Sequence, residues 1–379
     1  MKKELAKTLY QIADGIEQGH YGKRIRIALT TIGSELGAEE LVRGAELAGK
    51  RLPQLEIVLL GPRVETELEL IETDCLATAH QIMEEKLDTN EIDGAVTLHY
   101  TFPLGIATVG RIVSPATGKE MLLATTTGTS DTDRVSALLK NTIYGIATAR
   151  ALQIEEPSVG ILNIEGANLA ERNLKKLYEQ GYRINFAESA REDGGVTMRG
   201  NDLLQGTPDI MVVDSLTGNL LMKVFSAFAT GGGYEATGYG YGPGLGPGYQ
   251  RNIAIISRAS GAPVVANAIE YIAQLSRHQV NKLLQDELER AEKAGLNEIV
   301  ADLKQSRPAQ ESVVKAPPTK SVGEEIPGID ILEIEEAKES LWQVGIYAET
   351  GMGCTGPVIL VAEEDLTLAR ESLANNGYK

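Results

Sequence analysis

Short runs of β-branched and other apolar residues recur along the chain, and stretches with an apolar residue every three or four positions separate them. The runs are typical of buried strands, and the longer spacing is typical of amphipathic helices. The runs predict strands at residues 25–29, 55–60, 94–98, 121–124, 159–164, 210–213 and 252–256. Helices are expected at 38–50, around His80 and Glu84, at 132–152 and through most of 262–304. This alternation predicts an α/β fold with a largely parallel sheet.

Different patterns mark the two ends of the chain. Residues 2–18 predict a helix whose apolar stripe packs on its own core or contacts another subunit. Residues 325–379 predict a small α/β unit, with strands at 342–347 and 358–361 and a helix from 364 to about 375. Proline clusters in 306–324 predict a linker before this unit. We therefore expect an N-terminal helix (1–22), a main domain (23–275), a helix and Pro-rich linker (276–324) and a carboxyl-terminal unit (325–379).

Residues 231–249 are so rich in glycine that neither a helix nor an ordinary strand is expected there. The segment predicts a long flexible loop. Such a loop would serve as a lid over a site or would be a disordered surface excursion, and the sequence leaves both readings open.

Composition narrows the class of protein. The 379 residues suffice for two domains, and 42% hydrophobic with 23% charged residues is typical of a soluble globular protein. A net charge of −17 argues against a nucleic-acid partner, because nothing would offset phosphate repulsion. No apolar run approaches membrane-spanning length. Two distant cysteines and no secretory signal predict a reducing cytoplasm, where a thiol stays available.

The more reactive candidate thiol is Cys354, in the stretch Gly-Met-Gly-Cys-Thr-Gly-Pro at 351–357. A sulfur in a glycine-lined turn can be attacked and can carry an acyl group. The N–H groups of Gly353, Cys354 and Thr355 could hold an oxyanion and favour the thiolate. The alternative is a small buried hydrophobe. Cys75 lies beside Glu72 and Asp74, which would raise its pKa, so it is the weaker nucleophile.

Four polar, glycine-rich loops follow predicted strands, where open α/β sheets bind ligands: 30–34, 125–130, 215–219 and 257–261. The best anion candidate begins at Asp214 and has Lys223 one turn into the following helix. The phosphate- or substrate-binding candidates there are Ser215, Thr217, Gly218, Asn219 and Lys223. The alternative is an ordinary helix start with a capping residue. Asp131 and Asp133 are expected to cap a helix. No nucleotide motif or metal-ligand spacing is present.

Residues from about 25 to 275 resemble the PlsX-type phosphate acyltransferases. The resemblance lies in 28–48, 159–164, 185–202, the Asp-Ser-Leu-Thr-Gly-Asn run continuing to Lys223, and in Ser260 and Asn267. It implies a phosphotransacetylase-like fold and the joining of an acyl thioester with inorganic phosphate, and it adds Ser260 to the binding candidates. Glu171 or Arg172 replaces an expected lysine, and Ser257 stands where that family has a histidine.

The whole chain, with its acidic carboxyl-terminal unit, resembles the family of component C alpha subunits of the glycine/sarcosine/betaine reductase complex. The resemblance implies that Cys354 carries an acetyl group derived from carboxymethylated selenoprotein A, and that phosphate releases it as acetyl phosphate. It implies the component C beta subunit and selenoprotein A as partners and no cofactor besides phosphate as co-substrate. A homo-oligomer stays open. The competing hypotheses are an acyltransferase acting on acyl carrier protein, with Cys354 incidental, and a non-catalytic scaffold for the beta subunit.

Overall fold

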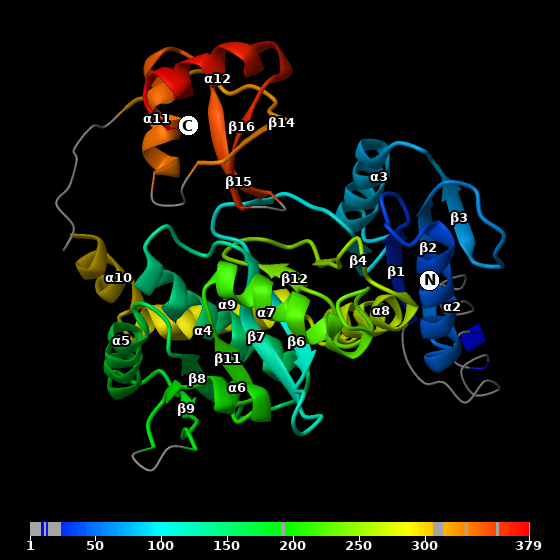
Figure 1. The fold of residues 1–379 in the computed structure, drawn as a ribbon, viewed down its shortest axis with the longest axis horizontal. Coiled ribbons are helices and arrows are strands. Elements are labelled where there is room, and N and C mark those ends of the chain that lie inside the picture. Colours follow the sequence, from blue (N-terminus) through cyan, green and yellow to red (C-terminus); the bar gives the residue numbers. More distant parts are fainter. Residues whose placement is uncertain are drawn as a thin grey trace.

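The computed structural model describes residues 24–190, 194–305, 314–329, 333–353 and 356–378, together with Leu9, Tyr10 and Ala13. The helix predicted at 2–18 therefore lies almost wholly outside the described residues, and so do Cys354 and Thr355. Figure 1 shows a broad main domain with a smaller carboxyl-terminal unit above it.

The main domain is built on one twelve-stranded sheet. Its strands are β1 (Ile25–Thr30), β2 (Leu55–Gly61), β3 (Glu69–Glu72), β4 (Gly94–Thr97), β6 (Ala107–Val113), β7 (Glu120–Gly128), β8 (Ser158–Leu162), β9 (Asn185–Phe186), β10 (Thr197–Met198), β11 (Ile210–Val212), β12 (Gly242–Leu245) and β13 (Ile253–Ile255). The order is β10-β8-β11-β7-β6-β12-β13-β4-β1-β2-β3, and β9 pairs with β8. Among the described strands of this sheet, only the pairings of β6 with β7 and of β12 with both neighbours are antiparallel, which confirms the predicted α/β fold with a largely parallel sheet.

Helices cover both faces of this sheet: α2 (Ala38–Arg51), α3 (Leu76–Asp88), α4 (Arg134–Ala151), α5 (Ala167–Glu179), α6 (Gly200–Gln205), α7 (Ser215–Ala227), α8 (Ala262–Arg277), α9 (Val280–Lys293) and α10 (Leu296–Gln305). The single-turn helix η1 (Phe228–Thr230) continues α7. Leu284, Leu288 and Ile299 of α9 and α10 are buried in the same core cluster as α4. These two helices, which the sequence grouped with the linker, therefore pack on the main domain.

The expectation of a long flexible loop at 231–249 is wrong. Residues 240–246 are buried, and β12 runs antiparallel between β6 and β13, where it joins the two halves of the sheet. Glycine is required here by space rather than by flexibility: a Cβ on Gly242 would lie 1.8 Å from the carbonyl oxygen of Val109. A Cβ on Gly244 would lie 2.3 Å from the ring of Phe102. The glycines let a strand pass through a crowded centre.

The carboxyl-terminal unit has the elements β14 (Glu324–Pro327), α11 (Ile334–Gln343), β15 (Ala348–Gly353), β16 (Gly356–Val361), η2 (Glu363–Asp365) and α12 (Leu366–Asn375). The strand predicted at 342–347 is wrong, because Trp342 lies in the last turn of α11. Ile334, Ala337 and Leu341 bury a helical face, and Gly345 ends the helix with φ +80°. The glycines at 351 and 353, expected in a turn, instead form the end of β15.

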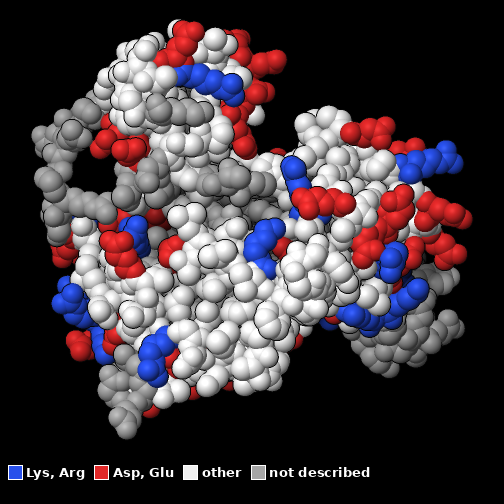
Figure 2. Space-filling view, in the orientation of Figure 1, with Lys and Arg blue, Asp and Glu red and all other residues white. Residues whose placement is uncertain are grey.

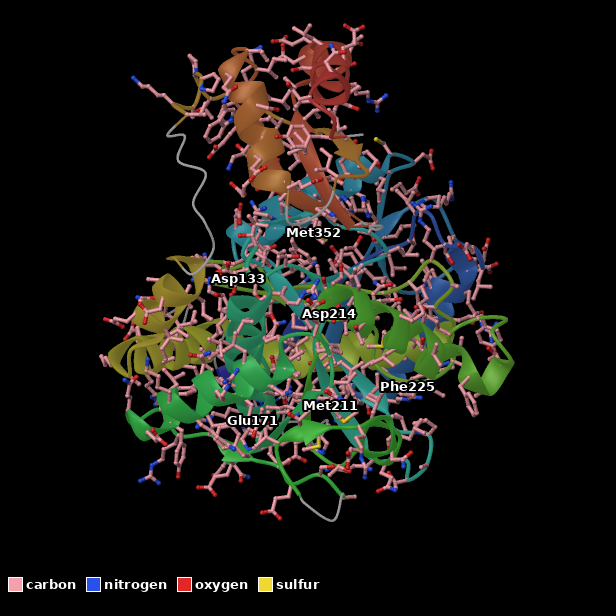
Figure 3. All side chains as sticks on the ribbon, turned by 60° about the vertical axis from the view of Figure 1, so that its left-hand side comes forward. Asp133, Glu171, Met211, Asp214, Phe225 and Met352 are labelled. Atoms are coloured by element: carbon pink, nitrogen blue, oxygen red, sulfur yellow. The ribbon has the colours of Figure 1, made fainter. Side chains whose placement is uncertain are left out.

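The carboxyl-terminal unit docks on the main domain through one short strand. β5 (Phe102–Pro103) pairs antiparallel with β15 and becomes the edge of a four-stranded sheet ordered β14-β16-β15-β5. The hydroxyl of Thr129 donates to the sulfur of Met352 at 3.4 Å, and Thr101 donates to Glu325. Figure 3 shows Met352 at the base of this unit, facing the main domain. No helix in the described ranges combines the length and apolarity that a membrane crossing requires.

Candidate functional site

A cavity of about 430 Å³ lies between the two parts of the molecule. Its wall comes from the carboxyl ends of β4 and β13, from β7, from one flank of α7 and from the end of β15, the last contributing Gly353. This is the edge at which open α/β sheets bind ligands. Leu98, Tyr241, Ile255 and Ile256 make part of the wall apolar, so the cavity combines a polar side with a hydrophobic side.

The cavity brings together three of the residues singled out from the sequence. Asn219 and Lys223 lie four positions apart, hence on one flank of α7, and Gly353 faces them from β15. Ser215, Thr217, Gly218 and Ser260 do not line it. Cys354 and Thr355, next along the chain from Gly353, lie outside the described residues.

The start of α7 is capped by its own chain. The Asp214 carboxylate accepts hydrogen bonds from the Thr217 N–H at 3.0 Å and the Thr217 hydroxyl at 2.7 Å. This is the capping arrangement that the sequence left open as the alternative to an anion site. The N–H group of Thr217 is thereby occupied, and α7 offers the cavity its flank rather than its N-terminus.

Gly218 sets the distance between α7 and the sheet. A Cβ at this position would lie 1.8 Å from the carbonyl oxygen of Thr125 on β7. Only glycine lets the helix backbone approach so closely. The contact fixes the depth at which Asn219, the next residue, and Lys223, one turn further on, reach the cavity.

Lys223, whose side chain is half exposed, belongs to a hydrogen-bond network that the sequence did not reveal. Its Nζ donates to Ser257 Oγ at 2.6 Å and lies 3.2 Å from Glu235 Oε1. Glu235 is 2% exposed, and its second oxygen accepts the Ser260 hydroxyl at 2.9 Å. Ser260 is fully buried and contacts Glu235 without lining the cavity. The only sequence signal for Glu235 was its position as the single charged residue among the glycines of 231–249.

The hydroxyl of Ser257 can still donate one hydrogen bond. Its oxygen accepts from Lys223 Nζ and from the Ala259 N–H at 3.1 Å. A serine hydroxyl has two acceptor sites and one donor, so its proton remains available. Ser257 is 7% exposed and lines the cavity, which makes an acceptor in the cavity the natural partner of that proton.

A second cation lies at the rim. Arg258 is exposed and lines the cavity, and no residue in the described ranges holds its guanidinium by a hydrogen bond or ion pair. Glu35 also lines the cavity and lies beside Arg258, since its backbone N–H donates to the Arg258 carbonyl at 2.8 Å. With Lys223, Arg258 brings a second cation to a lining that also holds Glu35, and Lys223 is itself paired with the buried Glu235. An anion in the cavity would therefore be held at these two cations rather than by an overall positive wall.

Two histidines lie near the cavity. His99 lines it and has its Nε2 4.0 Å from Glu325 of the carboxyl-terminal unit. His80 lies behind it, 3.1 Å from the Thr97 hydroxyl. Burial lowers the pKa of His80, and the neighbouring His99 lowers it further.

The aspartates of the loop after β7 have structural partners. Asp133 caps α4 by accepting the Ser136 N–H at 2.8 Å, as expected. Asp131 is 3% exposed and pairs with Lys140 at 2.6 Å and Lys304 at 3.0 Å. Burial opposes ionisation of Asp131, but the hydrogen bonds from Lys140 and from the backbone outweigh it and lower the pKa.

The prediction that the pKa of the Cys75 thiol is raised is wrong. Cys75 is exposed at the N-terminus of α3, where the N–H and hydroxyl of Thr78 and the N–H of Ala77 lower the pKa of the thiol. The neighbouring carboxylates have less effect than these hydrogen bonds. Cys75 does not line the cavity.

Glu171, which stands near a position where the PlsX family has lysine, also lies off the site. It accepts the Thr197 hydroxyl at 2.8 Å and pairs with Lys175 at 2.7 Å on α5. Figure 3 shows it far from Met352. Among the described residues, no group of three or more His, Cys, Asp or Glu side chains could hold a metal ion.

The sequence profile described as "Fatty acid synthesis protein" matches residues 25–360. The component C subunit alpha of the glycine/sarcosine/betaine reductase complex from Peptoclostridium acidaminophilum is 52% identical over 379 residues, covering 100% of this chain and 98% of that protein. The chain belongs to this family of component C alpha subunits. This chain is also similar, more distantly, to phosphate acyltransferases. The one from Thermotoga neapolitana is 28% identical over 235 residues, covering 54% of this chain and 70% of that protein.

Among solved structures, a branched-chain phosphotransacylase from Enterococcus faecalis V583 has 16% identity to this family member and a TM-score of 0.48. The matched region covers 66% of this chain and 99% of the phosphotransacylase chain.

Proposed function

We propose that this chain is the acyl-phosphate-forming subunit of a glycine/sarcosine/betaine reductase component C, and that an acetyl thioester on Cys354 is cleaved by inorganic phosphate to acetyl phosphate. The observation that carries the proposal is that Gly353, the residue bonded to Cys354, lines the same cavity as Lys223, Ser257 and Arg258. The carboxyl-terminal unit and the main domain thus share one site. The 52% identical relative supports the assignment to the complex.

Inorganic phosphate is the co-substrate in this proposal, and no other cofactor takes part. Lys223 and Arg258 supply positive charge for the dianion, and Asn219 on the same flank of α7 supplies an amide. The apolar wall at Leu98 and Ile256 receives the methyl group of the acetyl. The predicted oxyanion donors are the N–H groups of Gly353 and Thr355, to which we add the Ser257 hydroxyl.

The reaction is a transfer of the acetyl group from sulfur to oxygen. A phosphate oxygen forms a bond to the thioester carbonyl carbon, and the carbonyl electrons move onto oxygen, where Ser257 donates to them. When the carbonyl re-forms, the carbon–sulfur bond breaks and Cys354 leaves as thiolate. The proton of the phosphate passes to the sulfur or to water. No oxidation or reduction occurs in this step.

The partners in this proposal are the component C beta subunit and selenoprotein A carrying a carboxymethyl group, in the cytoplasm, where Cys354 stays reduced. The acetyl group must reach Cys354 before phosphate attacks. The contact of the carboxyl-terminal unit with β5 is small, and a linker precedes β14. Both features support movement of this unit to a partner subunit and back to the cavity.

Two alternatives remain distinct from this proposal. An acyltransferase acting on acyl carrier protein would use the same cavity and would not need Cys354. A scaffold for the beta subunit would need neither the cavity nor Cys354. The wall of the cavity supports catalysis over a scaffold role, because Lys223 and Ser260 hold the buried Glu235 carboxylate, which costs free energy to maintain.

The test is turnover of the reconstituted complex with isotope-labelled substrate, followed by peptide mass spectrometry. We expect label on the peptide that contains Cys354, lost on adding phosphate. The Cys354→Ala chain should form no acetyl phosphate, whereas the Cys75→Ala control should be unaffected. Acyl phosphate formation by Cys354→Ala would support the acyl carrier protein reading. An unlabelled chain in an active complex would support the scaffold reading.

A further inference from the structure

A histidine and a glutamate face each other across the junction between the main domain and the carboxyl-terminal unit. His99 follows β4 and Leu98 and lines the cavity, with a side chain that is 24% exposed. Glu325 lies on β14, and its Oε1 is 4.0 Å from Nε2 of His99. This distance is within the range of an ion pair and longer than a hydrogen bond, so Glu325 acts on the imidazole through its charge. The pair exists only while the carboxyl-terminal unit is docked.

The backbone of His99 is held from the sheet. The Thr30 hydroxyl donates to Thr97 Oγ1 at 2.7 Å, and the Thr97 hydroxyl donates to the His99 carbonyl at 3.3 Å. The next residue, Tyr100, is anchored by a hydrogen bond of 2.8 Å from its hydroxyl to Glu84. The imidazole is therefore presented to the cavity from a segment that is fixed on both sides, as a functional group requires.

The strand pairing at the junction brings His99 to the same end of the ladder as Gly353. Phe102 lies opposite Met352 in the antiparallel pair of β5 and β15. Because the two strands run in opposite directions, the residues before Phe102 and those after Met352 leave the pair at the same end. His99 and Gly353 both line the cavity. The imidazole therefore shares this cavity with the residue bonded to Cys354.

Charges from several elements act on this imidazole. The charged and titratable groups near it are Glu325 on β14, His80 and Glu84 on α3, Lys223 on α7, Arg258 after β13 and Glu35 after β1. Lys223 and Arg258 oppose a positive charge on His99, whereas the carboxylates favour it. Among these carboxylates, Glu325 is the one supplied by the carboxyl-terminal unit, so docking of that unit makes an imidazolium in the cavity more favourable.

We propose that His99 carries the proton of the attacking phosphate to the departing sulfur of Cys354, and that Glu325 is a positioning residue that favours the imidazolium formed in between. The inference rests on the proposed function and adds a path for the proton. His80 is unsuited to this role, because it does not line the cavity and its Nε2 lies 3.1 Å from the Thr97 hydroxyl.

The proton transfers balance without a further reagent. A carboxylate facing Nε2 favours the tautomer that carries its proton there and leaves Nδ1 as the acceptor. As an oxygen of hydrogen phosphate bonds to the thioester carbon, Nδ1 takes the phosphate proton and His99 becomes an imidazolium. When the carbon–sulfur bond breaks, the sulfur takes this proton and leaves as the Cys354 thiol. The imidazole is neutral again, and acetyl phosphate departs as a dianion.

The first test is chemical rescue in the reconstituted component C, loaded with labelled acetyl on Cys354 and then given inorganic phosphate. His99→Ala should release acetyl phosphate about 10²–10⁴-fold more slowly. Free imidazole should restore part of the rate, because it can carry the proton in the space left by the side chain. Wild type with the same imidazole controls for direct attack on the thioester. His278→Ala is the matched control, because the His278 ring contacts the Ala151 carbonyl.

The second test separates charge from docking at the junction. Glu325→Gln keeps an acceptor for the Thr101 hydroxyl and removes the charge, whereas Thr101→Val removes the hydrogen bond and keeps the charge. The neutral imidazole is the active form, so the rate falls as acid protonates it. Without the carboxylate, protonation needs a lower pH. Glu325→Gln should therefore shift the acid limb of the rate profile to lower pH and slow release about tenfold.

Thr101→Val should leave the acid limb in place, and titration of phosphate itself is the same in every variant. A His99→Ala rate equal to that of wild type, a loss that imidazole does not restore, or the same profile in Glu325→Gln and Thr101→Val would overturn the inference. The proposed function would survive each of these results. A wild-type chain never acetylated on Cys354 would overturn both. Circular dichroism checks folding, and the Glu325→Gln profile decides if His99→Ala is unfolded.

Discussion

Met352 lies opposite Phe102 in the antiparallel pair that joins β15 to β5. One register position further along β15, Gly353 reaches the cavity wall. A strand of the main domain therefore sets the position of the residue before Cys354. The hydrogen bond from Thr101 to Glu325 of β14 holds the same junction. Placement of Gly353 thus depends on a contact formed across about 250 residues of sequence.

This junction can be loosened at Glu325. The Glu325→Ala change removes the acceptor of the Thr101 hydroxyl, at a cost of about 1–2 kcal/mol for a partly buried bond to a charged group. Opening of the junction should rise about 5–30-fold, seen as faster amide hydrogen exchange in residues 348–353. Glu324→Ala is the control, because Glu324 is adjacent and exposed. Equal exchange in the two variants would show that the Thr101 bond does not hold the unit.

Lys223 should affect phosphorolysis more than acetylation. Lys223→Met removes a cation from the cavity wall and the donor to Ser257. We expect acetyl phosphate release from the acetylated chain to slow about 10²–10³-fold, while acetyl-Cys354 accumulates. Lys175→Met, at an exposed α5 ion pair, is the control. Because Glu235 would lose its cation, the double variant with Glu235→Gln separates catalysis from stability: its release should stay slow. Recovery of the rate there would mean that Lys223 only balances a buried charge.

Gly218→Ala should destabilise the fold. The new methyl group would overlap the Thr125 carbonyl and push α7 away from the sheet. We expect a loss of about 1–3 kcal/mol in the free energy of unfolding, measured by denaturant titration. Gly200→Ala in α6 is the matched control, because a Cβ there meets nothing within 4 Å and φ is not left-handed. It should be neutral or slightly stabilising. Equal effects at the two positions would refute the close approach.

Local pattern predicted most of the fold and part of the site. The buried strands could be predicted because strands that are buried on both faces, such as 55–60 and 210–213, have continuous apolar runs in the sequence. Asn219 and Lys223 were predicted because they belong to a polar loop and helix start that follow a predicted strand, although the structure presents them from the flank of α7 rather than from its N-terminus. Glu235 was not predicted, and Ser257 was named only as part of a candidate loop and as a departure from the PlsX pattern, since the role of each depends on a contact with Lys223 from a distant segment.

The missed elements share a physical cause. Strand β12 is made of glycine and proline, so its propensity is poor, and only the crowding by Val109 and Phe102 explains it. The apolar run at 342–347 predicts a strand, but the helix that starts at Ile334 extends into this run, and Gly345 ends it. In both cases tertiary packing overrides local preference.

Shortening the segment 306–324 should slow turnover of the complex. Lys304, near the end of α10, is held by Asp131, so the segment starts from a fixed point on the main domain. A deletion of about half the segment reduces the reach of the carboxyl-terminal unit. We expect slower acetyl phosphate release by the complex. Phosphorolysis of chain already acetylated should change little. Insertion of a Gly-Ser segment of the deleted length should restore the rate, and an unchanged rate in the deletion variant would reject movement of the unit.

His80 should make the stability of the fold depend on pH. Burial and His99 hold the pKa of His80 below its ordinary value of 6.5, so the folded protein keeps this imidazole neutral where the unfolded chain protonates it. The unfolded state then binds more protons, and stability rises with pH in that window. The contribution is complete above about pH 6.5 and is lost as pH falls toward the folded pKa.

We therefore expect His80→Gln, which can retain a hydrogen bond to the Thr97 hydroxyl, to lose less stability than wild type between about pH 7 and pH 5. The measurement is the free energy of unfolding by urea at each pH. Glu84, whose charge favours the imidazolium, provides the opposing change: Glu84→Gln should deepen the acid loss. His278→Gln is the control, because the His278 ring contacts the Ala151 carbonyl rather than Thr97 or His99. Parallel curves for wild type and His80→Gln would show that His80 titrates alike in both states.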